Sequence, residues 1–305
     1  WYKYQNLEAV SKINQPNLQP SIKHKLFLNN QNTNSEISLS AHEIKNDEGY
    51  NIQRWSGSGL VEYKIDNKLG DLILSAETGL DLYAIKIRPS TDTNDNKYLD
   101  RLSLGLSVMS KKDLFYNFGE YNFLITPKFQ ISSMHSTDRK DDIPNRDSSD
   151  FKNDQANLFL INQYQGRDNI QTNQKITFGV DNELQTGIGS FSFFIGQSQR
   201  IGGTNNNILN SNLNRQSDII KELTWEISEK YNVSYNALLD HHNLEENYTS
   251  FELFGKLSGL NYDLIHRSIS KNIINTDNDR EELKFSIGKN IFDVNLSYSA
   301  TYDLK

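Results

Sequence analysis

The chain has 305 residues, of which 36% are hydrophobic, and its 15 Tyr, 15 Phe and 3 Trp with only 5 Pro exclude a solvated, disordered chain. The absence of Cys excludes a disulfide framework and a thiolate metal site in this chain. A formal net charge of −7, scattered over turns without a basic stripe, argues against a nucleic-acid partner.

Strand-like runs follow one another along the chain, and in the clearest of them apolar residues occupy every second position. No segment sustains the apolar period of a helix. A run of about 18 apolar residues is also absent, so the sequence predicts no transmembrane helix. We therefore predict an all-β fold. In chain order the runs cover 22–28, 37–41, 60–65, 72–85, 102–108, 123–131, 176–184, 191–197, 223–227, 231–239, 251–257, 260–264, 283–287 and 292–302.

Two kinds of connection separate these runs along much of the chain. Short turns are predicted at 66–70, 187–189, 258–259 and 289–290. Long connections rich in Asn, Asp and Ser are predicted at 89–97, 135–150, 202–218, 241–247 and 272–281. Tight periplasmic turns that alternate with extended external loops are typical of an outer-membrane barrel.

A transmembrane barrel also explains the low mean hydropathy of −0.67, because only alternate residues of each strand meet lipid while the lumen is polar. We predict a transmembrane antiparallel β-barrel with up-and-down meander connectivity. At roughly 20 residues per strand and connection, the chain supplies about 14 to 16 strands. Because the pattern starts and stops abruptly, we expect residues 1–305 to be a portion of one larger barrel domain.

Aromatic residues near the predicted strand ends favour a girdle at the lipid headgroups, although aromatic residues are common in strands of every kind. The residues concerned are Tyr83, Tyr98, Tyr121, Phe123, Tyr231, Tyr248, Tyr262, Tyr298 and Tyr302.

The sequence contains no strong pattern of catalytic or metal-binding residues. Acidic clusters at 92–96, 138–150 and 277–282 could offer oxygen ligands to calcium, but none has EF-hand spacing, and solvated loops explain them. His241 and His242 have no evident third ligand and point to opposite sides if they lie on a strand. No nucleophile elbow is present. We predict no catalytic site, no metal site and no cofactor.

The segment 126–200 resembles the C-terminal barrel domain of the LptD family (also called Imp or OstA), lipopolysaccharide-assembly proteins of the outer membrane, in its alphaproteobacterial form. The resemblance lies in TPKFQ at 126–130, IPNRDSSDF at 143–151, NLF at 157–159, GRD at 166–168 and IGQSQR at 195–200, in order over 75 residues. The candidate site residues that it supplies, for lumen or partner contact, are Pro127, Ile143, Pro144, Asn145, Asp147, Ser148, Asp150, Phe151, Asn157, Leu158, Phe159, Asn162, Gly166, Asp168, Gly196, Gln197 and Ser198.

The resemblance implies a barrel of about 26 strands that receives lipopolysaccharide from a periplasmic bridge protein and releases it into the outer leaflet through a lateral opening. It also implies an outer-membrane lipoprotein, LptE, as a plug in the lumen and an N-terminal jellyroll domain that docks the bridge. The expected partners of this chain are therefore lipopolysaccharide, an LptE-like lipoprotein, the bridge protein and the outer-membrane bilayer. Neither gate strand can be assigned.

We expect a non-enzymatic transport protein in the outer membrane of a Gram-negative bacterium. We also predict that the loop 143–150 folds into the lumen and contacts the lipoprotein or the substrate, with an ordinary external loop as the alternative. Two other functions remain open from the residues alone. One is another outer-membrane barrel, such as a porin or a receptor, and the other is a soluble all-β surface or adhesion protein.

Overall fold

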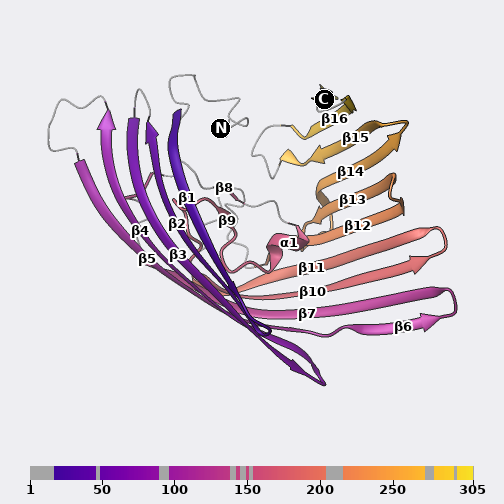
Figure 1. The fold of residues 1–305 in the computed structure, drawn as a ribbon, viewed down its shortest axis with the longest axis horizontal. Coiled ribbons are helices and arrows are strands. Elements are labelled where there is room, and N and C mark those ends of the chain that lie inside the picture. Colours follow the sequence, from indigo (N-terminus) through magenta and orange to yellow (C-terminus); the bar gives the residue numbers. More distant parts are fainter. Residues whose placement is uncertain are drawn as a thin grey trace.

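A computed structural model of the chain describes residues 17–45, 49–88, 96–137, 142–144, 149–150, 154–203, 216–271, 278–291 and 294–304. These residues form one large antiparallel sheet and a small two-stranded sheet (Figure 1). The elements are β1 (Asn17–Asn29), β2 (Thr33–Lys45), β3 (Gly49–Asn67), β4 (Gly70–Arg88), β5 (Asn96–Lys111), β6 (Leu114–Phe118), β7 (Tyr121–Ser136), β8 (Ser149–Asp150), α1 (Gln155–Leu158), β9 (Tyr164–Gln165), β10 (Asn173–Thr186), β11 (Gly189–Gly203), β12 (Ile219–Ser228), β13 (Tyr231–Leu239), β14 (Glu246–Leu257), β15 (Leu260–Ile269), β16 (Arg280–Ile291) and β17 (Val294–Asp303).

The large sheet has 15 strands, and its neighbours follow chain order from β1 through β5, β7 and β10 to β17, with β6 beside β7. All pairs are antiparallel, so the predicted meander and the predicted strand number are confirmed. Figure 1 shows that the sheet curves strongly, and no pairing among the described residues joins β17 back to β1. The chain therefore forms an open part of a barrel wall, which agrees with the predicted fold class.

Connections of different length gather at the two ends of the strands. At one end, which we call the turn end, two or three residues connect strands, as at 30–32, 68–69, 187–188 and 258–259. At the other, the loop end, the connections include 137–172 between β7 and β10. The turn predicted at 289–290 is wrong, because Lys289 and Asn290 pair with Leu296 and Asn295 inside the β16–β17 ladder.

The two faces of the sheet have the polarity of a membrane barrel. On β5 the buried side chains include Arg101, Ser103 and Ser107, whereas Leu102 and Leu104 are 54% and 51% exposed. The same alternation runs along β3, β4, β7 and β10. A soluble sheet buries its apolar face, so this reversal is expected only where the exposed face meets lipid. We call the polar side the concave face and the apolar side the convex face.

Pro127 lies where the strand beside β7 is interrupted. β5 pairs with β7 as far as Lys111, and β6 resumes the pairing at Leu114. The carbonyl of Pro127 accepts a hydrogen bond from Lys112 N at 3.3 Å, so its missing N–H also points toward the break. The Thr126 hydroxyl donates to Asp113 Oδ1 at 2.8 Å across the same gap. The proline thus sits at a break in the ladder, where no N–H donor is needed.

Two of the aromatic residues predicted for a headgroup girdle face the lumen instead. Tyr83 is 2% exposed and shares the concave parity of Asp81, because it alternates with the exposed Leu82. Tyr248 packs against a buried apolar cluster on the concave face. By contrast, Tyr98, Tyr121, Tyr298 and Tyr302 are between 52% and 76% exposed, as a girdle requires.

The only apolar clusters of the described residues are three groups between the concave face and the connection from β7 to β10. This connection includes α1, β8 and β9, which lie inside the curve of the sheet (Figure 1). Among the described residues, no helix is long and apolar enough to cross a membrane. We call the described residues between 142 and 172 the inward segment.

Candidate functional site

The inward segment begins and ends at the loop end but folds back over the concave face. It contains the short β8–β9 pairing, in which Ser149 and Asp150 face Gln165 and Tyr164. The single helical turn α1 lies between these two strands in the chain. The segment then returns to the sheet at the start of β10 (Figure 1). A long connection of the loop end is thus placed on the concave side of the sheet.

Three apolar anchors fix the inward segment to the wall. Ile143 is 5% exposed and packs in a cluster with Ile44 of β2, Ile52 of β3, and Tyr83 and Ile85 of β4. Leu158 of α1 is buried with Phe194, Ile220 and Leu238 from β11, β12 and β13. Ile161 and Ile170 pack against Met134 of β7. Together the anchors reach from β2 to β13, so the segment braces most of the described wall.

Glycines of the wall leave the space that the inward segment fills. A Cβ atom added to Gly196 would lie 2.7 Å from Leu158 Cδ2, and one added to Gly79 would lie 2.3 Å from Arg167 Nη2. Gly105 and Gly179 lie in the same way beneath Ile161 and Phe159, respectively. All four glycines are buried at concave positions of their strands. Glycine within a strand commonly marks the close approach of another part of the chain, and here that part is the inward segment.

The helix α1 is positioned by acceptors on both the loop and the wall. Asp154 caps it, because its Oδ1 accepts the N–H of Asn157 at 2.9 Å. Glu222 of β12 accepts the N–H of Gln155 at 2.7 Å. Below α1, a cavity of about 440 Å³ opens on the concave face, lined in part by Lys128, Glu222 and Asn236. The wall beneath the inward segment therefore keeps open, polar space.

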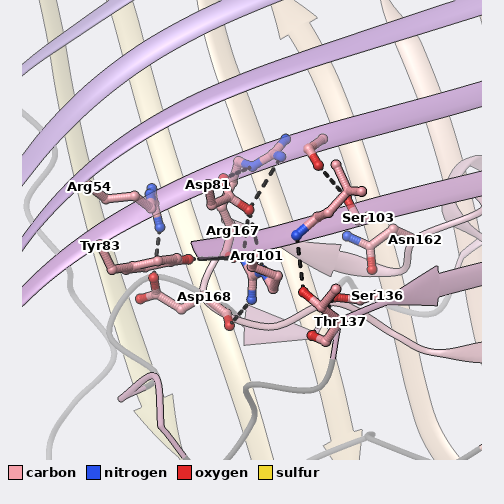
Figure 2. Close-up of polar contacts among 12 residues, drawn as sticks. Arg54, Asp81, Tyr83, Arg101, Ser103, Ser136, Thr137, Asn162, Arg167 and Asp168 are labelled. Carbon is pink, nitrogen blue, oxygen red and sulfur yellow. Dashed lines mark hydrogen bonds and ion pairs between the residues drawn. The ribbon is translucent and has the colours of Figure 1, made fainter. Parts of the chain in front are cut away.

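A buried charge network joins the inward segment to β3, β4 and β5 (Figure 2). Asp81 on β4 is 0% exposed and faces Arg101 across the β4–β5 ladder, with Arg101 Nη2 at 2.9 Å from Asp81 Oδ2. Arg167 from the inward segment donates from Nε to the other carboxylate oxygen of Asp81, also at 2.9 Å. Arg54 on β3 pairs with Asp168 of the segment at 2.7 Å.

The backbone of the segment is held by the same groups. Arg101 Nη1 donates to the carbonyl of Asp168 at 2.6 Å, and the Tyr83 hydroxyl donates to the carbonyl of Arg167 at 3.1 Å. Arg101 therefore contacts a carboxylate of the wall and a carbonyl of the segment at once. Because breaking a buried ion pair strands a desolvated charge, a network of this kind fixes one docked position.

Two further contacts close the return of the segment toward β10. Lys175, buried on β10, donates from Nζ to the carbonyl of Leu160 at 2.5 Å. Asn162 Oδ1 accepts the N–H of Gln171 at 3.2 Å, which ties the two limbs of the segment together. These two contacts satisfy one polar group of the buried loop through the wall and another through the loop itself.

The structure brings many of the candidate residues from the sequence to one place. In the inward segment, or beneath it on the concave face, lie Ile143, Pro144, Asn157, Leu158, Phe159, Asn162, Gly166, Asp168, Gly196 and Ser198. Pro127 and Gln197 occupy convex positions of β7 and β11. Asn145, Asp147, Ser148 and Phe151 lie outside the described residues, as does the side chain of Asp150. Contact of these residues with a partner or substrate stays a prediction.

Sequence reasoning missed the wall side of the network, namely Arg54, Asp81 and Arg101. A signal for them exists. Asp81 lies between the convex residues Leu80 and Leu82, and Arg101 directly precedes Leu102. A charge at a concave position inside an apolar alternation indicates a partner within the lumen, because an unpaired buried charge is costly.

Comparison with known proteins gives one family. A family model described as LptD, LPS transport system D, matches residues 1–295. Among solved structures, the chain is similar to the ferric citrate transporter FecA in its unliganded form, with a TM-score of 0.46 and 7% identity. That match covers 93% of this chain and 51% of the FecA chain, so this chain spans about half of that structure's length. No curated protein matches.

Proposed function

The chain belongs to the LptD family of the LPS transport system, and from this membership we propose that it carries lipopolysaccharide across the outer membrane and inserts it into the outer leaflet. The family belongs to the outer membrane of Gram-negative bacteria and consists of transport and assembly proteins, not enzymes. The observation that carries the proposal is the match of the family model over residues 1–295.

The two-faced wall supports transport of an amphiphile. The sugar and phosphate head of lipopolysaccharide requires a hydrated path, whereas its acyl chains require an apolar one. The concave face offers polar side chains such as Glu222 and Asn236, which line its cavity, and the convex face offers Leu102, Leu104 and Leu106 to the bilayer. Movement between these environments breaks no covalent bond, so the proposed function needs positioned surfaces instead of a catalytic group.

The inward segment gives the proposed path a direction. We propose that the turn end is periplasmic, because short turns lie on that side of outer-membrane barrels. The segment then covers the external half of the concave face, where Arg54, Tyr83 and Arg101 lie near the loop ends of their strands. A head group that enters from the turn end meets the segment above it. This arrangement favours exit sideways, toward the outer leaflet.

Partners and further domains follow from the family and are part of the proposal. We propose an LptE-like lipoprotein in the lumen beside the inward segment, and a periplasmic bridge protein that delivers the substrate to the turn end. We further propose that an N-terminal jellyroll domain and additional strands complete the protein. The described sheet leaves both β1 and β17 with an unpaired edge, which further strands would cover.

Site-specific photo-crosslinking tests the proposed path. A photoreactive residue at Ser234 would face the lumen near the turn end, because this position pairs with Thr224 and Glu252 on the concave face. The neighbouring Val233 has convex parity and serves as the matched control. We expect lipopolysaccharide adducts at 234 and none at 233, where the inner leaflet of the bilayer lies. No adduct at 234 in a protein that is folded and inserted would contradict the proposal and favour another kind of barrel.

A further inference from the structure

A second group of polar side chains lies at the loop end, apart from the network of the inward segment. Asp218 directly precedes β12, and Asp240 and His241 directly follow β13. One carboxylate oxygen from each Asp and one imidazole nitrogen of His241 all lie within 4.8 Å of one another. The two connections 204–218 and 240–245 thus contribute to a single cluster.

The register of the sheet explains why these residues meet. Ile220 and Leu238 face each other across β12 and β13 on the concave face. Asp218 stands two residues before Ile220, and Asp240 stands two residues after Leu238. If the antiparallel pairing is continued by two residues, Asp218 lies opposite Asp240, and the two carboxylates are on the same face. Adjacent carboxylates on neighbouring strands repel each other unless a cation lies between them.

Burial makes this repulsion costly. Asp218 is 7% exposed, and the hydrogen bond that it accepts comes from a neutral amide, Asn247 Nδ2, at 3.1 Å from its Oδ2. No described residue donates to its Oδ1. A buried carboxylate with one free oxygen and an acidic neighbour is a group that a cation would stabilise.

Asp240 is already oriented for such a role. Its Oδ1 accepts the N–H groups of His242 and Asn243 at 2.8 Å and 3.2 Å. The remaining oxygen, Oδ2, has no hydrogen-bond partner among the described residues. These two hydrogen bonds fix the orientation of the carboxylate and leave one oxygen for a ligand.

We propose that Asp218, Asp240 and His241 form a binding site for one divalent cation of the zinc class. Two carboxylates and one imidazole are a ligand set that suits zinc, with water completing the coordination. Calcium prefers six to eight oxygen ligands, which this cluster does not offer. The bound ion would connect the β11–β12 connection to the β13–β14 connection and brace the loop-end rim above the cluster of Ile220 and Leu238. This inference does not depend on the proposed transport function.

Titration calorimetry with Zn²⁺ tests the site on the whole protein, purified in detergent and freed of metal with a chelator. We expect one Zn²⁺ per chain, and binding at least tenfold weaker in His241→Ala and in Asp218→Asn, because loss of even an indirect partner weakens metal sites by about 10- to 100-fold. His135→Ala is the matched control, since it removes an exposed imidazole of β7 that is not in the cluster. Equal affinities in all four proteins, or an equal loss in His135→Ala, would overturn the proposal.

Two more measurements keep the result decisive. Asn247→Ala leaves all three ligands in place but removes the amide that orients Asp218, so we expect weaker binding without complete loss. Its unfolding temperature without metal shows whether it is folded. Tighter binding of Ca²⁺ than of Zn²⁺ to the wild-type protein would refute the assigned class of ion. A rise in unfolding temperature with Zn²⁺ that is absent in His241→Ala would support the bracing role.

Discussion

Replacement of Asp81 by Asn should release the inward segment from the wall. Asp81 is 0% exposed and is the shared partner of Arg101 and Arg167, whose side chains are 5% and 22% exposed. The Asn side chain keeps one oxygen acceptor in the same place but removes the charge. Arg101 would then lie buried without a carboxylate, although it would keep the carbonyl of Asp168 and the hydroxyl of Tyr83.

The size of the effect follows from these contacts. Breaking a buried ion pair typically costs about 3–5 kcal/mol. The contacts that Arg101 keeps, and the partial exposure of Arg167, reduce this to roughly 2–3 kcal/mol of docking free energy. At about 1.4 kcal/mol per factor of ten, the undocked population should rise on the order of 100-fold. The sheet itself should remain intact, because the β4–β5 ladder does not depend on this side chain.

Amide hydrogen exchange measured by mass spectrometry can detect this change. Peptides that cover 156–172 should exchange faster by a factor on the order of 100, because exchange there follows the local opening equilibrium. Peptides from β15 and β16, which lie outside the three apolar anchors of the segment, should be unchanged. Glu62→Gln, which removes a concave carboxylate of β3 from outside the network, is the control. Unchanged protection of 156–172 in Asp81→Asn would refute the view that the charge network holds the segment.

Three further substitutions test the wall. Gly196→Ala places a methyl group 2.5 Å from Phe194 Cζ and 2.7 Å from Leu158 Cδ2, where α1 meets the wall, and should weaken docking by about 1–3 kcal/mol, measured by the same exchange. Gly187→Ala, in open space at a turn, should not weaken it. Leu104→Arg puts a charge on the convex face and should destabilise the protein by up to about 2–4 kcal/mol. A urea titration in lipid vesicles measures this loss, and an unchanged stability would argue against lipid contact there. The ring of Tyr262 covers Gly255 so closely that a Cβ atom added there would lie 2.0 Å from it. Tyr262→Ala should therefore cost about 1 kcal/mol in that titration. An unchanged midpoint would mean that the ring does not protect this strand.

The alternation of apolar and polar residues was sufficient to predict the strands, because along its whole length each strand has one side toward lipid and the other toward the lumen. The predicted run 231–239 coincides with β13, and the run 72–85 lies within β4. β6 was missed because the break at Lys112 and Asp113 leaves only five residues, too few for a periodic pattern. The turn expected at 289–290 was wrong because Lys and Asn can also continue a strand near its exposed end.

The docked position of the inward segment could not be predicted in the same way, because its contacts join residues far apart in the chain. The ion pair between Arg54 and Asp168, for example, spans 114 residues. No periodicity links such positions, and the resemblance to the family marked the segment without its place on the wall. The two carboxylates that accompany His241, Asp218 and Asp240, were missed for a related reason, since the register of β12 and β13 was needed to bring Asp218 to His241.

The residue types at concave positions nevertheless indicate what covers them. A lumen wall that faces only water has no reason to place glycine in the middle of long strands, because glycine weakens a strand. Yet Gly79, Gly105, Gly179 and Gly196 all occupy concave positions, and a side chain of the inward segment lies over each. Asp81 and Arg101 stand beside the first of these glycines. The wall is therefore shaped for a segment of its own chain, and the segment belongs to the folded state of the barrel instead of being an external loop that happens to lie inward.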